Sequence, residues 1–142
     1  MATLTDLKVT LLSTWVVRPS PPGVLEFARS TDGSTGILQV SLLDTDDDHD
    51  LFHEGNLAAL ARKLAEGLSK RGQNWGTPVT STEGNCALGR FGLAVFTNGQ
   101  FPAMLLWVTA SETSALMWTW LGPDPQSREV EEASRMVMSA RW

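Results

Sequence analysis

The decisive stretch of this sequence is 103-AMLLWVT-109, followed after a short polar segment by 115-ALMWTWL-121. We interpret the two apolar runs as β-strands, because their lengths and residue types are typical of buried strands. Side chains alternate between the two faces of a strand. In the first run Ala103, Leu105 and Trp107 oppose Met104, Leu106 and Val108, and in the second Leu116, Trp118 and Trp120 oppose Ala115, Met117 and Leu121. Because all four sets are largely apolar, something must cover both faces of these strands.

Two interpretations explain the doubly apolar strands, and the sequence favours neither. In the first, two helices pack on opposite faces of the sheet. In the second, part of the sheet is an exposed apolar surface for a dimer or another partner. The second interpretation predicts a groove for an apolar helix, because flexible Met and large aromatic side chains suit such surfaces. The predicted groove residues are Met104, Leu106, Trp107, Met117, Trp118 and Trp120.

The flanking segments predict an α+β fold in one domain, residues 1–142. Alternating or apolar patterns favour strands over 4–12, 24–30, 37–43, 78–82 and 86–96. Proline and glycine place a turn at 19–23, Glu83-Gly84-Asn85 suggests a hairpin turn, and Asn98-Gly99 another. With the helices below, the order favours a mainly antiparallel sheet of about six strands flanked by two main helices.

Two segments show helical periodicity. The first is expected to be capped by Asn56 and ended by Gly72, with Arg62, Glu66 and Lys70 on its polar face. The second starts at Asp124 or Ser127. The apolar stripe of the first is Leu57, Leu60, Ala61, Leu64, Ala65 and Leu68, and that of the second is Val130, Ala133, Val137 and Ala140. Glu129, Glu131 and Glu132 lie near the positive N-terminal end of the second helix.

Composition excludes several classes of protein. The chain has 142 residues, 42% of them hydrophobic and 19% charged, which is a globular balance. The net charge of −5 argues against a nucleic-acid partner. The N-terminal residues lack the pattern of a signal peptide, and no run approaches the ~18 apolar residues of a membrane span. With a single cysteine, Cys86, we expect a cytoplasmic protein without stable membrane insertion.

The main candidate location for catalytic chemistry is the acidic segment 44-DTDDDHDLFHE-54, whereas Cys86 is interpreted as a passive strand cysteine. A calcium loop starting at Asp44 would need Gly and Glu where His49 and Gly55 stand, so that match fails. Zinc could bind His49 and His53 with an aspartate, but a loop without fixed geometry is a poor site. A solvated acidic loop is therefore the preferred interpretation. We predict no catalytic residue, no metal and no cofactor, with a small metal-dependent enzyme using 44–54 as the alternative.

The order of several segments resembles one known family. These segments are Leu12–Trp15 before a strand, the long amphipathic helix, Gly92–Phe96, and Met117–Gly122 followed by the helix over Glu129–Ser139. Together they resemble the Mog/PsbP-like fold, and within it the DcrB-like group, over nearly the whole chain. Apolar patterns and turns carry the resemblance, and the many tryptophans in the last two strands depart from it.

The resemblance implies a binding protein and not an enzyme. Members of that fold include a nuclear-transport GTPase binder, a photosystem extrinsic subunit and the Eag chaperones of type VI secretion effectors. Without a signal peptide, this chain is most similar in kind to the Eag chaperones, which dimerise around apolar effector helices. The expected function is thus a homodimeric chaperone or adaptor that shields apolar helices of a type VI secretion effector. No functional residue is carried over, because no residue-level motif matches.

Overall fold

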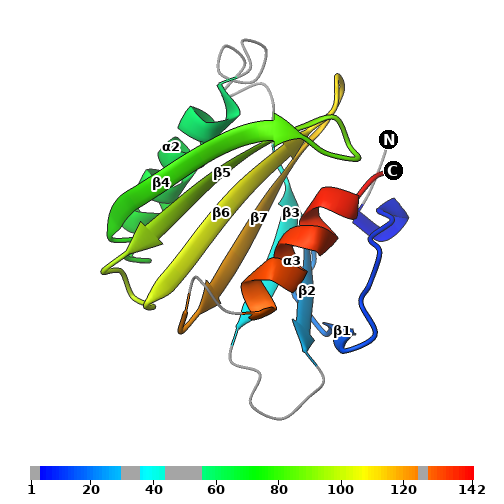
Figure 1. Ribbon diagram of the computed structural model, residues 1–142, viewed down its shortest axis with the longest axis horizontal. Helices are drawn as coiled ribbons and strands as arrows, with labels where there is room; N and C mark the ends of the chain where they lie inside the picture. The colour runs from blue at the N-terminus through cyan, green and yellow to red at the C-terminus, as the bar shows by residue number, and fades with distance from the viewer. Residues whose placement is uncertain (1–3, 30–35, 44–55, 125–127) are drawn as a thin grey trace.

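The computed structural model describes residues 4–29, 36–43, 56–124 and 128–142. Within these ranges the chain forms a seven-stranded antiparallel sheet in the order β1-β2-β3-β7-β6-β5-β4, with one α-helix on each face (Figure 1). This confirms the predicted α+β class and mainly antiparallel sheet, with seven strands where about six were expected. The strands are β1 Trp15–Arg18, β2 Val24–Arg29, β3 Ile37–Leu42, β4 Thr77–Asn85, β5 Arg90–Thr97, β6 Ala103–Ala110 and β7 Ala115–Gly122.

The sheet centre is the pair β6 and β7, which the two apolar runs form as predicted. Trp107 lies opposite Trp118, and Leu105 lies opposite Trp120. One face of the pair joins a core cluster with helix α3, Arg128–Ser139, and the other joins a cluster with helix α2, Leu57–Lys70. We call these the α3 face and the α2 face. The α3 face carries Ala103, Leu105, Trp107, Leu116, Trp118 and Trp120, and the α2 face carries Met104, Leu106, Val108, Ala110 and Ala115.

The two helices cover different halves of the sheet. Helix α2 packs against β4, β5 and β6, whereas α3 packs against β6 and β7 on the opposite face. Figure 1 shows α2 behind the β4–β6 half and α3 in front of the β7–β3 half. The interpretation with helices on opposite faces is therefore confirmed for the central strands.

The start of the chain differs from the prediction, because residues 4–12 do not form a strand. Leu4–Asp6 is a short 3₁₀ helix, η1, and only Lys8 makes a β-bridge, to Arg141. The apolar residues that suggested a strand, Leu4, Leu7, Val9 and Leu12, pack on the α3-side core from an irregular segment. Their spacing mixes two and three residues, so it lacks the strict alternation that a half-buried strand needs.

The hairpin turn predicted at 83–85 is wrong by three residues. Glu83 and Gly84 lie within β4, opposite Gly92 and Phe91 of β5. The turn is Cys86–Gly89, closed by reciprocal backbone hydrogen bonds of 3.1 Å. Gly84 fits in a strand because a Cβ there would lie 2.7 Å from the Phe91 ring, which covers the glycine.

Helix α2 ends just before Gly72, as the sequence predicts. Gly72 has a φ of +100°, a conformation that glycine adopts without steric cost. The Gln73 N–H donates to the Leu68 carbonyl at 3.1 Å and the Gly72 N–H to the Ser69 carbonyl at 3.2 Å. This is the Schellman arrangement, which satisfies carbonyls that the helix leaves open.

The N-terminal end of α2 is held by β4 and β5. Asn56 precedes the helix but makes no side-chain capping hydrogen bond. The Ala58 N–H instead donates to Glu83 Oε1 at 3.0 Å, so a carboxylate from β4 caps the helix. Opposite Glu83 lies Gly92, where any Cβ would overlap with the backbone of Leu57. A glycine on β5 thus lets the helix end rest directly on the sheet.

Candidate functional site

The six predicted groove residues do not form one surface. Trp107, Trp118 and Trp120 lie on the α3 face, and the other three on the α2 face. All except Met117 are 0% exposed: Met104, Leu106, Trp107, Trp118 and Trp120. The predicted groove is therefore corrected, because the chain's own helices cover the strands that were expected to line it. Only Met117, which is half-buried, remains accessible.

The tryptophans pack in the core against specific partners. The Trp118 indole N–H donates to Thr109 Oγ1 at 2.9 Å, within the α3-side cluster. Trp120 rests on Gly36 and Gly122, where an added Cβ at either glycine would overlap with the indole ring. These packing partners come from three separate strand regions, so the tryptophans have a structural role.

A cluster of charged groups anchors α3 on the sheet. Glu129, only 8% exposed, accepts a hydrogen bond from the Gly36 N–H at 3.2 Å and lies 3.9 Å from the Arg29 guanidinium. Glu132 lies 3.3 Å from Arg29 and accepts the Trp15 indole N–H at 3.3 Å. The sequence placed these glutamates at the helix N-terminus, but it did not show that they bond to the sheet. Their oxygens are engaged by protein groups, so the cluster positions α3.

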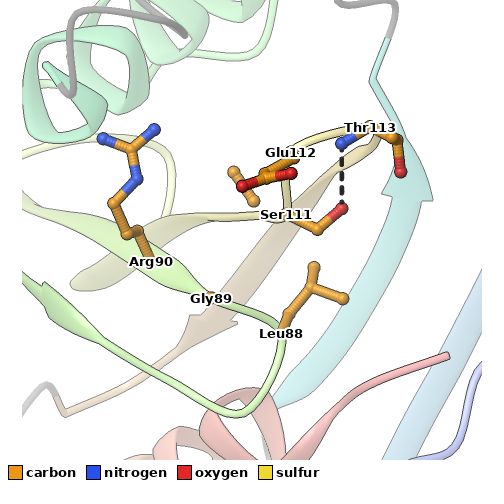
Figure 2. A pocket seen from close by; sticks show the side chains of 7 residues that line it. Leu88, Gly89, Arg90, Ser111, Glu112 and Thr113 are labelled. Atoms are coloured by element: carbon orange, nitrogen blue, oxygen red, sulfur yellow. Dashed lines mark hydrogen bonds between the residues drawn. The ribbon is translucent and has the colours of Figure 1, made fainter.

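An open pocket of about 540 Å³ lies at one end of the sheet. It lies where the β4–β5 and β6–β7 turns meet, and Figure 2 shows Arg90 and Glu112 projecting from the two sides. The Ser111 hydroxyl accepts backbone N–H groups of Thr113 at 3.3 Å and Ser114 at 3.1 Å, which stabilises the turn (Figure 2). These hydrogen bonds give Ser111 a structural role in the β6–β7 turn.

Metal binding was considered for the acidic segment 44–54, which lies outside the described residues. Within the described ranges no group of three or more His, Cys, Asp or Glu side chains is placed to hold a metal ion. Also within those ranges, no helix has the length and apolar character to cross a membrane.

A partly exposed apolar surface lies on the α2 face beside α2. On β6 this face is fully buried under the helix, with Met104, Leu106 and Val108 at 0% exposure. One strand further, Met117 and Leu121 of β7 are only half-buried, although both pack against the α2-side core. Half-buried apolar side chains continue onto β3, where Ile37 lies opposite Leu121, and to Leu43 just after it. We call Ile37, Leu43, Met117 and Leu121 the β7 strip.

A polar row divides the β7 strip into two apolar ends. Thr119 lies between Met117 and Leu121, and it is opposite Gln39 of β3. The Gln39 amide donates to Glu26 at 2.8 Å, and Glu26 in turn lies 3.6 Å from Arg18. The strip thus has two apolar ends, with the buried Thr119 and the half-buried Gln39 between them.

The position of the β7 strip follows from the width of the sheet. A helix is about 10 Å across, whereas adjacent strands lie about 4.8 Å apart. One helix therefore covers two or three strands, and two helices on opposite faces leave half of each face uncovered in a sheet of this width. An apolar second face on β7 or β3 would be expected to lie at such an uncovered half.

Comparisons with known proteins support the fold alone. No family model matches the chain, and no curated protein matches it either. A crystal structure from Bacteroides thetaiotaomicron VPI-5482 is similar, with a TM-score of 0.50 and 13% sequence identity over 99% of this chain. The match covers 46% of that protein, so this chain spans less than half of its length.

Proposed function

We propose that this protein is a non-enzymatic binding module, an adaptor or chaperone that shields an apolar helix of another protein. The β7 strip is the observation that carries the proposal, because it is an apolar surface bordered by a fixed helix. Half-buried side chains such as Met117 and Leu121 gain further burial when a partner docks. The flexible Met117 side chain also adapts to partners of different shape.

The dimensions of the β7 strip suit a helix lying along β7. Met117 and Leu121 are four residues apart on a strand, which corresponds to about 13 Å. A helix rises 1.5 Å per residue and turns once in 3.6 residues, so two anchors on the same helix face that reach both ends are about seven or eight residues apart. Between them we expect a small or polar residue, because Thr119 and Gln39 lie at the middle of the strip.

The cellular setting of the proposal follows from the family resemblance. We propose a cytoplasmic chaperone of a type VI secretion effector, with no metal or cofactor. A neighbouring gene for a large secreted protein with N-terminal apolar helices supports this partner class, and a consistent genomic setting without such genes contradicts it. We also propose a homodimer, but not through the six predicted groove residues, because five of them are fully buried.

Binding of a labelled apolar helical peptide, followed by fluorescence anisotropy, tests the proposed function. The peptide carries leucines about seven residues apart with a serine between them on the same helix face, as the helix rise and turn require. We expect Met117→Glu and Leu121→Glu to weaken binding at least about tenfold, because each introduces a charge that the complex must desolvate.

The matched control is Val17→Glu, which places the same charge on a 56% exposed side chain at the β1 edge. Its affinity should equal that of the unchanged protein, and circular dichroism should show all variants folded. Lack of peptide binding by the unchanged protein contradicts the proposal. Equal loss of affinity in all three variants contradicts the location on the β7 strip.

A further inference from the structure

The two edges of the sheet differ in what they offer to another chain. The edge strand β1 has only four residues and is followed by Pro19. The other edge strand, β4, has nine residues, and all except the half-buried Gly84 are exposed. In the described part of the chain, no strand pairs with the outer edge of β4 (Figure 1). An exposed edge strand is a template for pairing with another strand.

Only part of β4 is suited to such pairing. Pro78 has no N–H to donate, and the register with β5 shifts between Pro78 and Thr80. Prolines and bulges of this kind are features that block edge pairing. From Thr80 to Asn85 the register with β5 is regular, and these six residues include no proline. Two of them, Thr80 and Thr82, are β-branched and favour an extended backbone.

We infer that a second copy of this chain pairs with β4 in antiparallel orientation, centred on Thr82. A twofold axis perpendicular to the sheet keeps each side chain on the same face of the joined sheet. Directly opposed residues of an antiparallel pair share a face, whereas neighbours in sequence lie on opposite faces. The axis must therefore pass beside one residue, which lies opposite the same residue of the second copy. Centring on Thr82 or Glu83 keeps five pairs within the regular segment, whereas any other centre keeps three or fewer.

The charge of Glu83 decides between the two centres. Centring on Glu83 would place two carboxylates directly opposite each other, which is destabilising. Centring on Thr82 places threonine opposite threonine, a favourable cross-strand pair, and Ser81 opposite Glu83 of the second copy. Glu83 can remain the cap of α2, because its Oε1 already accepts the Ala58 N–H.

The occupant is a second copy because the segment is complementary to itself. In the register centred on Thr82, the only charged residue of the segment, Glu83, lies opposite the Ser81 hydroxyl and not opposite another charge. The inferred pairing rests on the proposed homodimer but not on the proposed helix binding, since β4 lies three strands from β7 in the sheet order. Pairing at β4 leaves the β7 strip accessible.

Site-specific cross-linking tests the inferred pairing and its register. In a Cys86→Ser background, Thr82→Cys is treated with a short bis-maleimide, and dimer formation is followed on denaturing gels. We expect Thr82→Cys to cross-link at least about tenfold faster than Thr80→Cys, whose opposite residue is Gly84, because opposed Cβ atoms lie about 5 Å apart. Val17→Cys, at the other edge, is the control for random collision.

Light scattering on the unchanged protein gives the second readout. We expect a species of twice the 15.5 kDa chain mass, and at least tenfold weaker association in the Ser81→Lys, Thr82→Lys double variant. A monomer up to ~100 µM overturns the inference. A dimer that resists the lysines and cross-links no faster at Thr82 than at Val17 overturns the location. Faster cross-linking at Thr80 than at Thr82 overturns the register.

Discussion

At the scale of single residues, glycines decide where the largest side chains fit. Trp120 is fully buried, and Gly36 and Gly122 lie against its indole ring from two different segments. A side chain at either position would need space that the indole occupies. The tryptophan and its two glycines therefore form one packing unit, in which a methyl group is large enough to matter.

Gly122→Ala tests this packing unit. We expect it to lower the free energy of unfolding by about 1–3 kcal/mol, the usual cost of adding volume to a filled core. The control is Gly67→Ala, because a Cβ at Gly67 in α2 would meet nothing within 4 Å. Alanine favours a helix over glycine by about 0.5–1 kcal/mol, so this variant should be more stable. Urea unfolding measures both changes, and equal effects of the same sign would refute the explanation.

At the scale of elements, α2 depends on β4 for its N-terminal cap. Replacing Glu83 with alanine leaves the Ala58 N–H without its acceptor and removes a negative charge from the helix N-terminus. We expect a loss of about 1 kcal/mol in the free energy of unfolding. Glu66→Ala, on the exposed side of the same helix, should change stability by less than about 0.5 kcal/mol. If the two variants lose the same stability in urea unfolding, Glu83 is not the cap.

Elements whose determinants are local could be predicted from the sequence. The C-terminal end of α2 follows from Gly72, whose backbone conformation needs no distant partner. The division of β6 and β7 into two faces follows from strand alternation. The N-terminal end of α2 could not be predicted, because its cap is Glu83, 25 positions from Ala58. The turn at 86–89 was missed since Glu83-Gly84-Asn85 has turn-like composition, while the Phe91 ring makes Gly84 suitable for a strand.

The candidate site was less predictable than the elements. Sequence alternation shows that Trp118 and Met117 face opposite ways, but it does not show which side a helix covers. That depends on where α2 and α3 dock, through contacts such as Arg29 with Glu132 and Gly92 with Leu57. As a result the predicted groove includes the accessible Met117, wrongly includes the buried Trp118 and omits Ile37.

At the scale of the whole molecule, the two helices leave the sheet half covered on each face. Helix α2 covers β4 to β6 on one face, and α3 packs on β6 and β7 on the other. The proposed binding surface lies in the half beside α2. There, burial decreases from the fully buried Leu106 on β6 to the half-buried Met117 on β7. The inferred pairing at β4 uses a different part of the molecule, so binding and dimerisation are expected to be separable.

The central claim is that an apolar helix binds on the β7 strip. Its most direct test is the change in backbone amide NMR shifts when the unlabelled peptide is added to isotope-labelled protein. We predict that the largest changes occur at Ile37, Leu43, Met117 and Leu121 and along the neighbouring side of α2. Residues of β1 and the Arg90–Glu112 pocket should change little. Largest changes at that pocket or on the α3 face, or no changes with peptide in excess, would contradict the account.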